Sequence, residues 1–187
     1  MIFYKEKSEG NGGYQHFDEE DFVIAIEKND WKSVSKWHCW TETQIDKYQD
    51  KLDWKLLSEN YNYKMKWSSS LLEKYEHKLD WDRLSENDNG HLFTIKKLHK
   101  FSDKWNWEIL SSNRSAFQQV EQVEEFKDKI VWSELIERGT YYEDYFTFDF
   151  VKKYKSYIPA DKFFKSALWK WILQDNEQEM FEKILRD

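Results

Sequence analysis

The chain has 187 residues, 35% of them charged, and a formal net charge of −7, a balance that disfavours ordinary binding to nucleic-acid backbones. Aromatic residues make up 19% of the chain, which excludes the disordered class that so high a charge would otherwise suggest. One proline and five glycines are too few for the turns of an all-β protein, and the single cysteine, Cys39, excludes an internal disulfide framework.

Residues 1–17 hold three of the five glycines, and we expect them to form an N-terminal tail or a small irregular cap. Their start lacks the apolar core of a signal peptide, and no apolar run in the chain approaches the ~20 residues of a membrane span. A lone cysteine also suits a reducing compartment. We therefore expect a cytoplasmic protein without a membrane partner, in the host cytoplasm if the protein is viral.

A phrase of fourteen residues at 47–60 returns at 74–87, with the shared pattern Lys-Tyr-x-x-Lys-Leu-Asp-Trp-x-x-Leu-Ser-Glu-Asn. Weaker copies follow at 100–113, 126–135 and 154–163, and a degenerate first copy lies at 30–34. A period of about 20 to 50 residues is typical of stacked supersecondary units. Residues 18–165 are therefore predicted to form five to six helical repeats of about 25–27 residues.

Each copy begins with a segment whose apolar residues recur at i, i+3 and i+7, as in Ile45, Tyr48 and Leu52. This spacing predicts one face of an amphipathic helix. Thr41, with Gln44 three residues later, predicts a capping box at its start. The equivalent caps in later copies are Ser68, Thr94 and Thr147.

The second segment of each copy is predicted to be a short helix that starts at Asp53, Asp80 or Asn106, whose side-chain oxygens can cap free backbone N–H groups. Asn60, Asn87 and Asn113 are expected to end it in a left-handed conformation. Tryptophan and leucine at i and i+3 face one way, so an internal Trp81→Ala is expected to cost about 3 to 5 kcal/mol. The expected repeat core is Trp54, Trp81, Trp107, Trp132, Leu57, Leu84, Leu110 and Leu135.

The fold class that follows is all-α, an α-solenoid of stacked helix pairs. Residues 166–187 are expected to form a C-terminal capping helix region that covers the last pair, because solenoid ends need a distinct cap.

The phrase at 47–60 and 74–87 resembles the Trp-x-x-[Leu/Ile]-Ser helical repeats of uncharacterised proteins from large DNA viruses and some bacteria. The resemblance covers residues ~18 to 165 and implies a scaffold without a shared catalytic motif. It supplies no functional residues.

Motifs for phosphate loops, zinc proteases, paired cysteines and serine hydrolases are missing from the sequence, so we expect no enzyme, no catalytic residue and no cofactor. His38 and Cys39 are adjacent and diverge on a helix, which disfavours a joint metal or nucleophile site. His77, His91 and His99 lie in successive copies, but their register alone does not make them converge, and no metal site is expected.

The leading functional hypothesis is a non-enzymatic protein–protein interaction module with a protein partner of unknown identity. One alternative is a virus- or phage-encoded inhibitor of a host defence or nucleic-acid enzyme that mimics nucleic acid by its acidity. Another is nucleic-acid binding, which is disfavoured by the net charge, along the in-phase lysines Lys47, Lys51, Lys74, Lys78, Lys100 and Lys104. Aromatic residues that the phrase does not require are the interface candidates: Trp37, Tyr61, Tyr63, Tyr141, Tyr142 and Tyr145.

Overall fold

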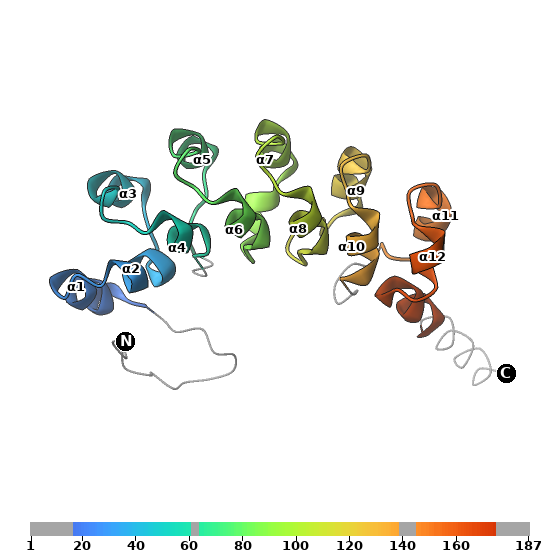
Figure 1. Ribbon diagram of the computed structural model, residues 1–187, viewed down its shortest axis with the longest axis horizontal. Coiled ribbons are helices and arrows are strands. Elements are labelled where there is room, and N and C mark those ends of the chain that lie inside the picture. Colours follow the sequence, from blue (N-terminus) through green and yellow to red (C-terminus); the bar gives the residue numbers. More distant parts are fainter. Residues whose placement is uncertain (1–16, 61–63, 139–144, 175–187) are drawn as a thin grey trace, which may run out of the picture. The chain divides into compact units, whose positions relative to one another are not determined.

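Every regular element is helical within residues 17–60, 64–138 and 145–174, the part of the chain that the computed structural model describes (Figure 1). This confirms the expected all-α class. The elements are α1 (Glu19–Glu27), α2 (Trp31–Trp37), α3 (Glu42–Tyr48), α4 (Trp54–Ser58), α5 (Ser69–Lys74), α6 (Trp81–Glu86), the 3-10 turn η1 (Gly90–Phe93), α7 (Ile95–Lys100), α8 (Trp107–Ser112), α9 (Val120–Phe126), α10 (Trp132–Glu137), α11 (Phe148–Tyr154) and α12 (Ala160–Phe163). Residues 167–174 are also helical.

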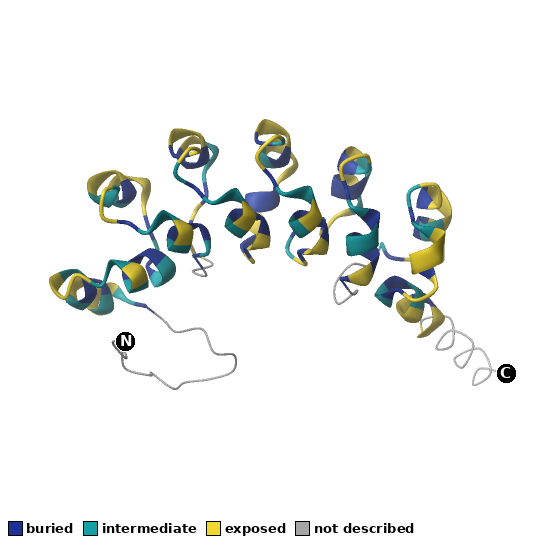
Figure 2. Cartoon of the chain, in the orientation of Figure 1, coloured by how far each residue is buried: buried dark blue, intermediate teal, exposed yellow. Residues whose placement is uncertain are grey.

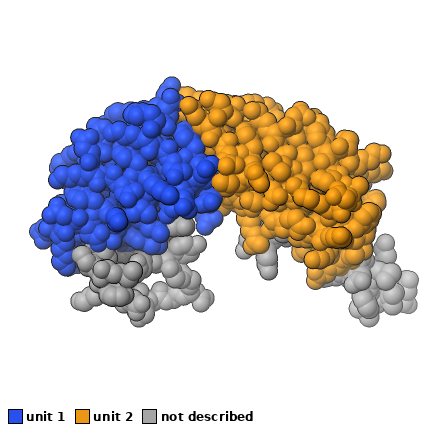
Figure 3. Space-filling model, viewed as in Figure 1, with its two compact units in different colours: residues 1–97 blue, residues 98–187 orange. Residues whose placement is uncertain are grey.

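Two compact units divide the chain, residues 1–97 and residues 98–187, and the division falls within α7 (Figure 3). In unit 1, α2, α4 and α6 contact one another in succession, and α3 and α5 lie on one side of them (Figure 1). In unit 2, α8, α10 and α12 do the same, with α9 and α11 beside them. Each helix buries one side and exposes the other (Figure 2).

Side-chain caps begin the helices where the sequence predicts them. The Asp53 carboxylate accepts the Leu56 N–H at 3.1 Å, and Thr41 and Gln44 form the expected capping box. Because these short polar side chains satisfy backbone donors that a helix start leaves open, they fix where each helix begins. The same cap is made by Asp30, Ser68, Asp80, Asn106 and Thr147.

Among the residues expected in the repeat core, the four leucines are all buried: Leu57, Leu84, Leu110 and Leu135. Burial of the tryptophans was predicted too broadly. Trp132 is buried, whereas three others are half-buried: Trp54, Trp81 and Trp107. Each indole N–H donates to a backbone carbonyl five residues upstream, as Trp54 does to Gln49 at 3.0 Å. The hydrogen bond holds the polar ring edge over the end of the preceding helix in all four, and Trp132 is covered more fully because Phe150, Tyr154 and Tyr157 all pack on its ring.

The predicted left-handed helix stop at the asparagines is wrong. Asn87 has φ −65° and Asn113 has φ −77°, both extended backbone conformations. Among the described residues other than glycine, positive φ occurs at Asn29 (54°) and Phe117 (49°). The asparagines recur because side-chain amides such as those of Asn60 and Asn87 form hydrogen bonds with the preceding helix pair.

Candidate interaction surface

A serine joins consecutive helix pairs in unit 1. The Ser58 hydroxyl donates to the Trp54 carbonyl of its own helix at 2.8 Å and accepts the Asp80 N–H of the next pair at 3.0 Å. Ser35 makes the same two bonds, to the Trp31 carbonyl and from the Asp53 N–H. One buried hydroxyl therefore satisfies two backbone groups in two different pairs.

A buried asparagine completes this joint. The side-chain amide of Asn60 donates to the carbonyls of Ser35 and His38, at 2.9 and 3.0 Å. Asn87 donates in the same way to Ser58 and Asn60, at 3.0 and 3.2 Å. Each amide thus meets two carbonyls of the preceding pair that a buried position would otherwise leave unsatisfied.

In unit 2 the asparagine position is held by Asn113, three residues after Leu110, and in the next pair by Arg138, three residues after Leu135. Arg138 is buried, and its guanidinium donates to the carbonyls of Asn113 and Ala116, both at 2.7 Å, and of Phe117 at 3.0 Å. The left-handed Phe117 turns its carbonyl toward this group. A longer, charged donor here reaches one more carbonyl than an amide would.

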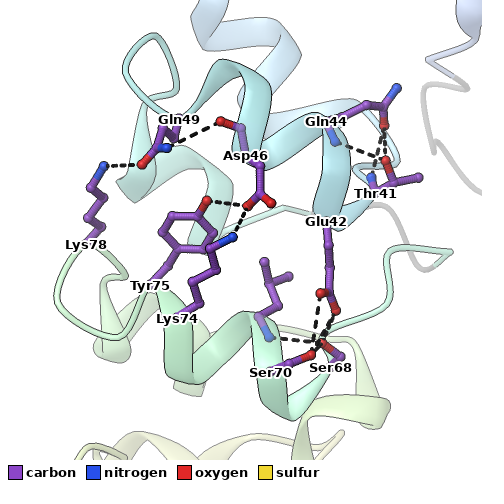
Figure 4. A network of polar contacts seen from close by, with 11 residues as sticks. Thr41, Glu42, Gln44, Asp46, Gln49, Ser68, Ser70, Lys74, Tyr75 and Lys78 are labelled. Carbon is purple, nitrogen blue, oxygen red and sulfur yellow. Dashed lines mark hydrogen bonds and ion pairs between the residues drawn. The ribbon is translucent and has the colours of Figure 1, made fainter.

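A carboxylate, a lysine and a tyrosine form a second type of joint between α3 and α5 (Figure 4). Asp46 accepts from the Lys74 ammonium at 2.7 Å and from the Tyr75 hydroxyl at 2.5 Å. These two hydrogen bonds lower the pKa of Asp46, and burial with the Asp46 bond raises the pKa of Tyr75 to about 12. Glu42, at the other end of α3, accepts from Ser68 and Ser70 of α5.

Unit 2 has the same trio at the same positions of its own helices. Glu124 of α9 accepts from Lys153 at 2.8 Å and from the Tyr154 hydroxyl at 2.6 Å, and also from Lys127 at 2.6 Å. Hydrogen bonds from these lysines and the tyrosine lower the pKa of Glu124 to about 2. We interpret the trio as a contact between successive pairs, since the lysine and tyrosine hold the Lys-Tyr positions of one copy and the carboxylate lies two residues before the aromatic residue of the preceding copy.

The second lysine of the phrase lies over the tryptophan of the preceding pair. Lys78 is 5.1 Å from the centre of the Trp54 ring and donates to Gln49 at 3.1 Å. Lys129 lies over Trp107 at 5.1 Å in unit 2. The recurrence of lysine is thus explained by cation–π and polar contacts inside each unit, without an external acidic partner.

The residues predicted to form an interface differ in their burial, in their contacts and in whether the structure describes them. Trp37 is half-buried, with the Lys36 ammonium 5.4 Å from its ring centre. Tyr145 is half-buried, donates to the Phe117 carbonyl and packs on Phe146 and Phe150, so it has a role inside unit 2. The remaining candidates lie outside the described residues: Tyr61, Tyr63, Tyr141 and Tyr142.

The side chains considered for metal or thiol chemistry do not converge. Cys39 is half-buried, and desolvation raises the pKa of its thiol, which reduces its nucleophilicity at neutral pH. His38 is buried and stacked on Phe22 with ring centres 4.0 Å apart, and burial lowers its pKa. His99 pairs with Glu125 at 2.6 Å. Among the described residues, no group of three or more His, Cys, Asp and Glu side chains could hold a metal ion.

Large apolar side chains remain exposed at positions that the sequence reasoning missed. Phe164 is 65% exposed, Trp171 42% and Leu173 45%, all near the C-terminal end of the described part of unit 2. A signal was present for Phe164, which stands where the serine of the phrase stands in earlier copies, one residue after the buried Phe163. Val23 of α1, Ile95 of α7 and Phe148 of α11 are also exposed.

None of the helices within residues 17–60, 64–138 and 145–174 combines the length and the apolar character that a membrane span requires. No protein-family model matches the chain, and neither a curated protein nor a solved structure matches it.

Proposed function

We propose that the chain is an α-solenoid of stacked helix pairs that binds another protein and catalyses no reaction. The proposal rests on one difference: residues that repeat in each copy of the phrase contact neighbouring helix pairs, whereas some residues that do not repeat are exposed. Periodic serines, asparagines, lysines and tyrosines contact neighbouring pairs within a unit, as Ser58, Asn87 and Tyr75 do. Non-periodic Phe164 and Trp171 are exposed and available to a partner.

The acids that recur in the phrase support a non-catalytic role. Asp53 and Asp80 each accept a backbone N–H from the first turn of the helix that follows them, at 3.1 Å in both cases, and so act as caps. The in-phase lysines Lys74 and Lys78 already contact Asp46 and Gln49. We therefore do not place a nucleic acid on them, although a net charge of −7 leaves acidic mimicry as a form that protein binding could take.

The test is affinity capture with the full chain as bait, using the double variant Phe164→Ser, Trp171→Ser beside the parent. We expect the parent to retain a protein at about equal molar amount and the variant to lose most of it, because exposed aromatics supply much of the energy of an interface. Ile95→Ser is the matched control, since Ile95 is 37% exposed and lies on α7, away from this segment of the sequence.

Recovery of the same protein with both baits, or of none with the parent, would contradict the proposal. Capture of a basic nuclease or polymerase would identify the chain as an inhibitor of such an enzyme, which is one form of the proposed protein binding. Loss of capture in Ile95→Ser as well would point to a different surface.

A further inference from the structure

The C-terminal end of the described chain carries a basic and apolar surface that contrasts with the rest of the protein. Residues 150–174 contain six lysines and one aspartate, in a chain whose net charge is −7. We define the C-terminal patch as Phe164 and Leu173 with the exposed lysines Lys165 and Lys170, since Leu173 lies one turn after Trp169 on the helix 167–174. Trp169 supports it, with its ring centre 5.3 Å from that of Phe164.

The position of Phe164 has a counterpart inside unit 2 that shows what such a position normally meets. Ile136 stands at the same place in α10, one residue after the buried Leu135, and is itself 1% exposed. Phe164 follows the buried Phe163 of α12 but is 65% exposed. An apolar side chain that is covered in one pair and bare in the next indicates a surface that something else covers.

An acidic surface with an exposed apolar centre lies at the other end of the described chain. Residues 18–27 hold five acidic residues and no basic one. Helix α1 buries Phe22 and Ala25 on one side. On the opposite side it exposes the α1 acidic face, which is Glu19, Glu20, Val23 and Glu27.

We propose that the C-terminal patch of one copy binds the α1 acidic face of a second copy, so that the chain associates head to tail. The inference rests on the proposed protein-binding function and names the partner. Lysines beside Phe164 and Leu173 and carboxylates around Val23 are complementary, whereas two C-terminal patches would repel each other. A heterologous contact of this kind leaves one patch and one acidic face open, so association continues beyond a dimer.

Charge reversal in the full chain tests the proposal by light scattering across a concentration series. The parent is expected to exceed the monomer mass at low salt and to dissociate at high salt. Glu20→Lys with Glu27→Lys, or Lys165→Glu with Lys170→Glu, should each weaken association roughly tenfold or more, because each sets like charges against each other. Mixing the two double variants should restore association, because each then meets a complementary face.

Matched controls make the same net charge changes elsewhere. They are Glu76→Lys with Glu108→Lys, and Lys55→Glu with Lys96→Glu, all at exposed side chains. Both should associate as the parent does, and circular dichroism checks that every variant is folded. Phe164→Ser with Leu173→Ser should also weaken association.

A parent that stays monomeric at every concentration would overturn the head-to-tail inference. So would α1 variants that associate normally while the patch variants do not, since the patch would then bind something other than α1. The proposed function survives both results if affinity capture still returns a different protein at the same patch.

Discussion

The two units solve one problem with different chemistry. In unit 1 a neutral amide, Asn60 or Asn87, donates to two buried carbonyls of the preceding helix pair. In unit 2 the position has an amide at Asn113, but in the α10 pair the guanidinium of Arg138 makes the joint instead and reaches three carbonyls, one of them on the left-handed Phe117. The comparison teaches that the joint preserves donated hydrogen bonds to the backbone, while the donor's identity and charge can change.

The largest expected effect comes from removing the donor in unit 2. Arg138→Met leaves three buried carbonyls without this partner, and we expect it to lower the free energy of unfolding by about 4 kcal/mol. Denaturant unfolding measures it. Asn60→Leu leaves two carbonyls and should cost about 2 kcal/mol.

Equal losses for Arg138→Met and Asn60→Leu would break the comparison, because the number of carbonyls would then not matter. Arg114→Met is the control: Arg114 is exposed and its guanidinium donates to the Arg138 carbonyl, so its loss should cost about 1 kcal/mol or less.

The tryptophans give the next largest difference. Trp132 in unit 2 is 6% exposed and packs on Tyr154 and Tyr157, so Trp132→Ala should cost about 3 kcal/mol. Trp54 in unit 1 is half-buried, and Trp54→Ala should cost roughly half as much. Thermal and denaturant unfolding compare the two, and a larger loss at Trp54 would contradict the burial argument.

Acid sensitivity should distinguish unit 1. Burial lowers the pKa of His38, although Gln44 and Glu19 act in the opposite direction. The unfolded chain therefore binds the proton more readily, and stability should fall as the pH drops through about 6.5, the ordinary histidine value. His38→Phe should flatten this decline, measured by denaturant unfolding between pH 5 and 8.

The exposed His91 provides the control, because His91→Gln should leave the pH profile of the parent unchanged. A profile that is the same in His38→Phe and the parent would exclude His38 as the source.

The smallest effects concern the carboxylate, lysine and tyrosine trios. Tyr75→Phe removes a hydroxyl that donates to Asp46, and Tyr154→Phe one that donates to Glu124. Each should cost about 1 kcal/mol or less. Tyr154→Phe should cost less, because Glu124 keeps two lysines, and double-mutant cycles with the carboxylates measure the difference.

An alkaline absorbance titration gives a second readout for unit 1. The pKa of Tyr75 is raised to about 12, and the pKa values of Tyr154 and Tyr157 in unit 2 are also raised, so Tyr75→Phe should reduce the amplitude of late tyrosine ionisation by one group. An unchanged amplitude would assign the late ionisation to other tyrosines.

Local features of this fold could be predicted and distant ones could not. The caps at Thr41 and Asp53 depend on residues within three positions, and they were predicted correctly. The role of Asn60 depends on carbonyls that lie 25 and 22 residues earlier in the chain, so a local interpretation as a helix stop was wrong. Arg138 was missed because it differs from asparagine, although its offset from Leu135 was visible.

The tryptophan burial was overestimated for a related reason. A pattern of Trp and Leu at i and i+3 indicates the side of a helix that faces inward, but it does not show that the indole N–H of Trp54 reaches the Gln49 carbonyl. Phe164 could be found from the sequence as a departure from the period, whereas its exposure and that of Trp171 depend on tertiary packing.

The acceptors in the asparagine and arginine joints are all backbone carbonyls, which every residue type supplies. The donor of one helix pair therefore does not require a particular residue type at the positions whose carbonyls it binds. The acceptor residues are accordingly mixed: Ser58, Asn60, Ala116 and Phe117. A duplicated or deleted helix pair would bring its own donor and meet the same acceptors. This joint therefore does not limit a change of chain length by gene duplication, whereas the trio of Asp46, Lys74 and Tyr75 requires matched side chains in adjacent pairs.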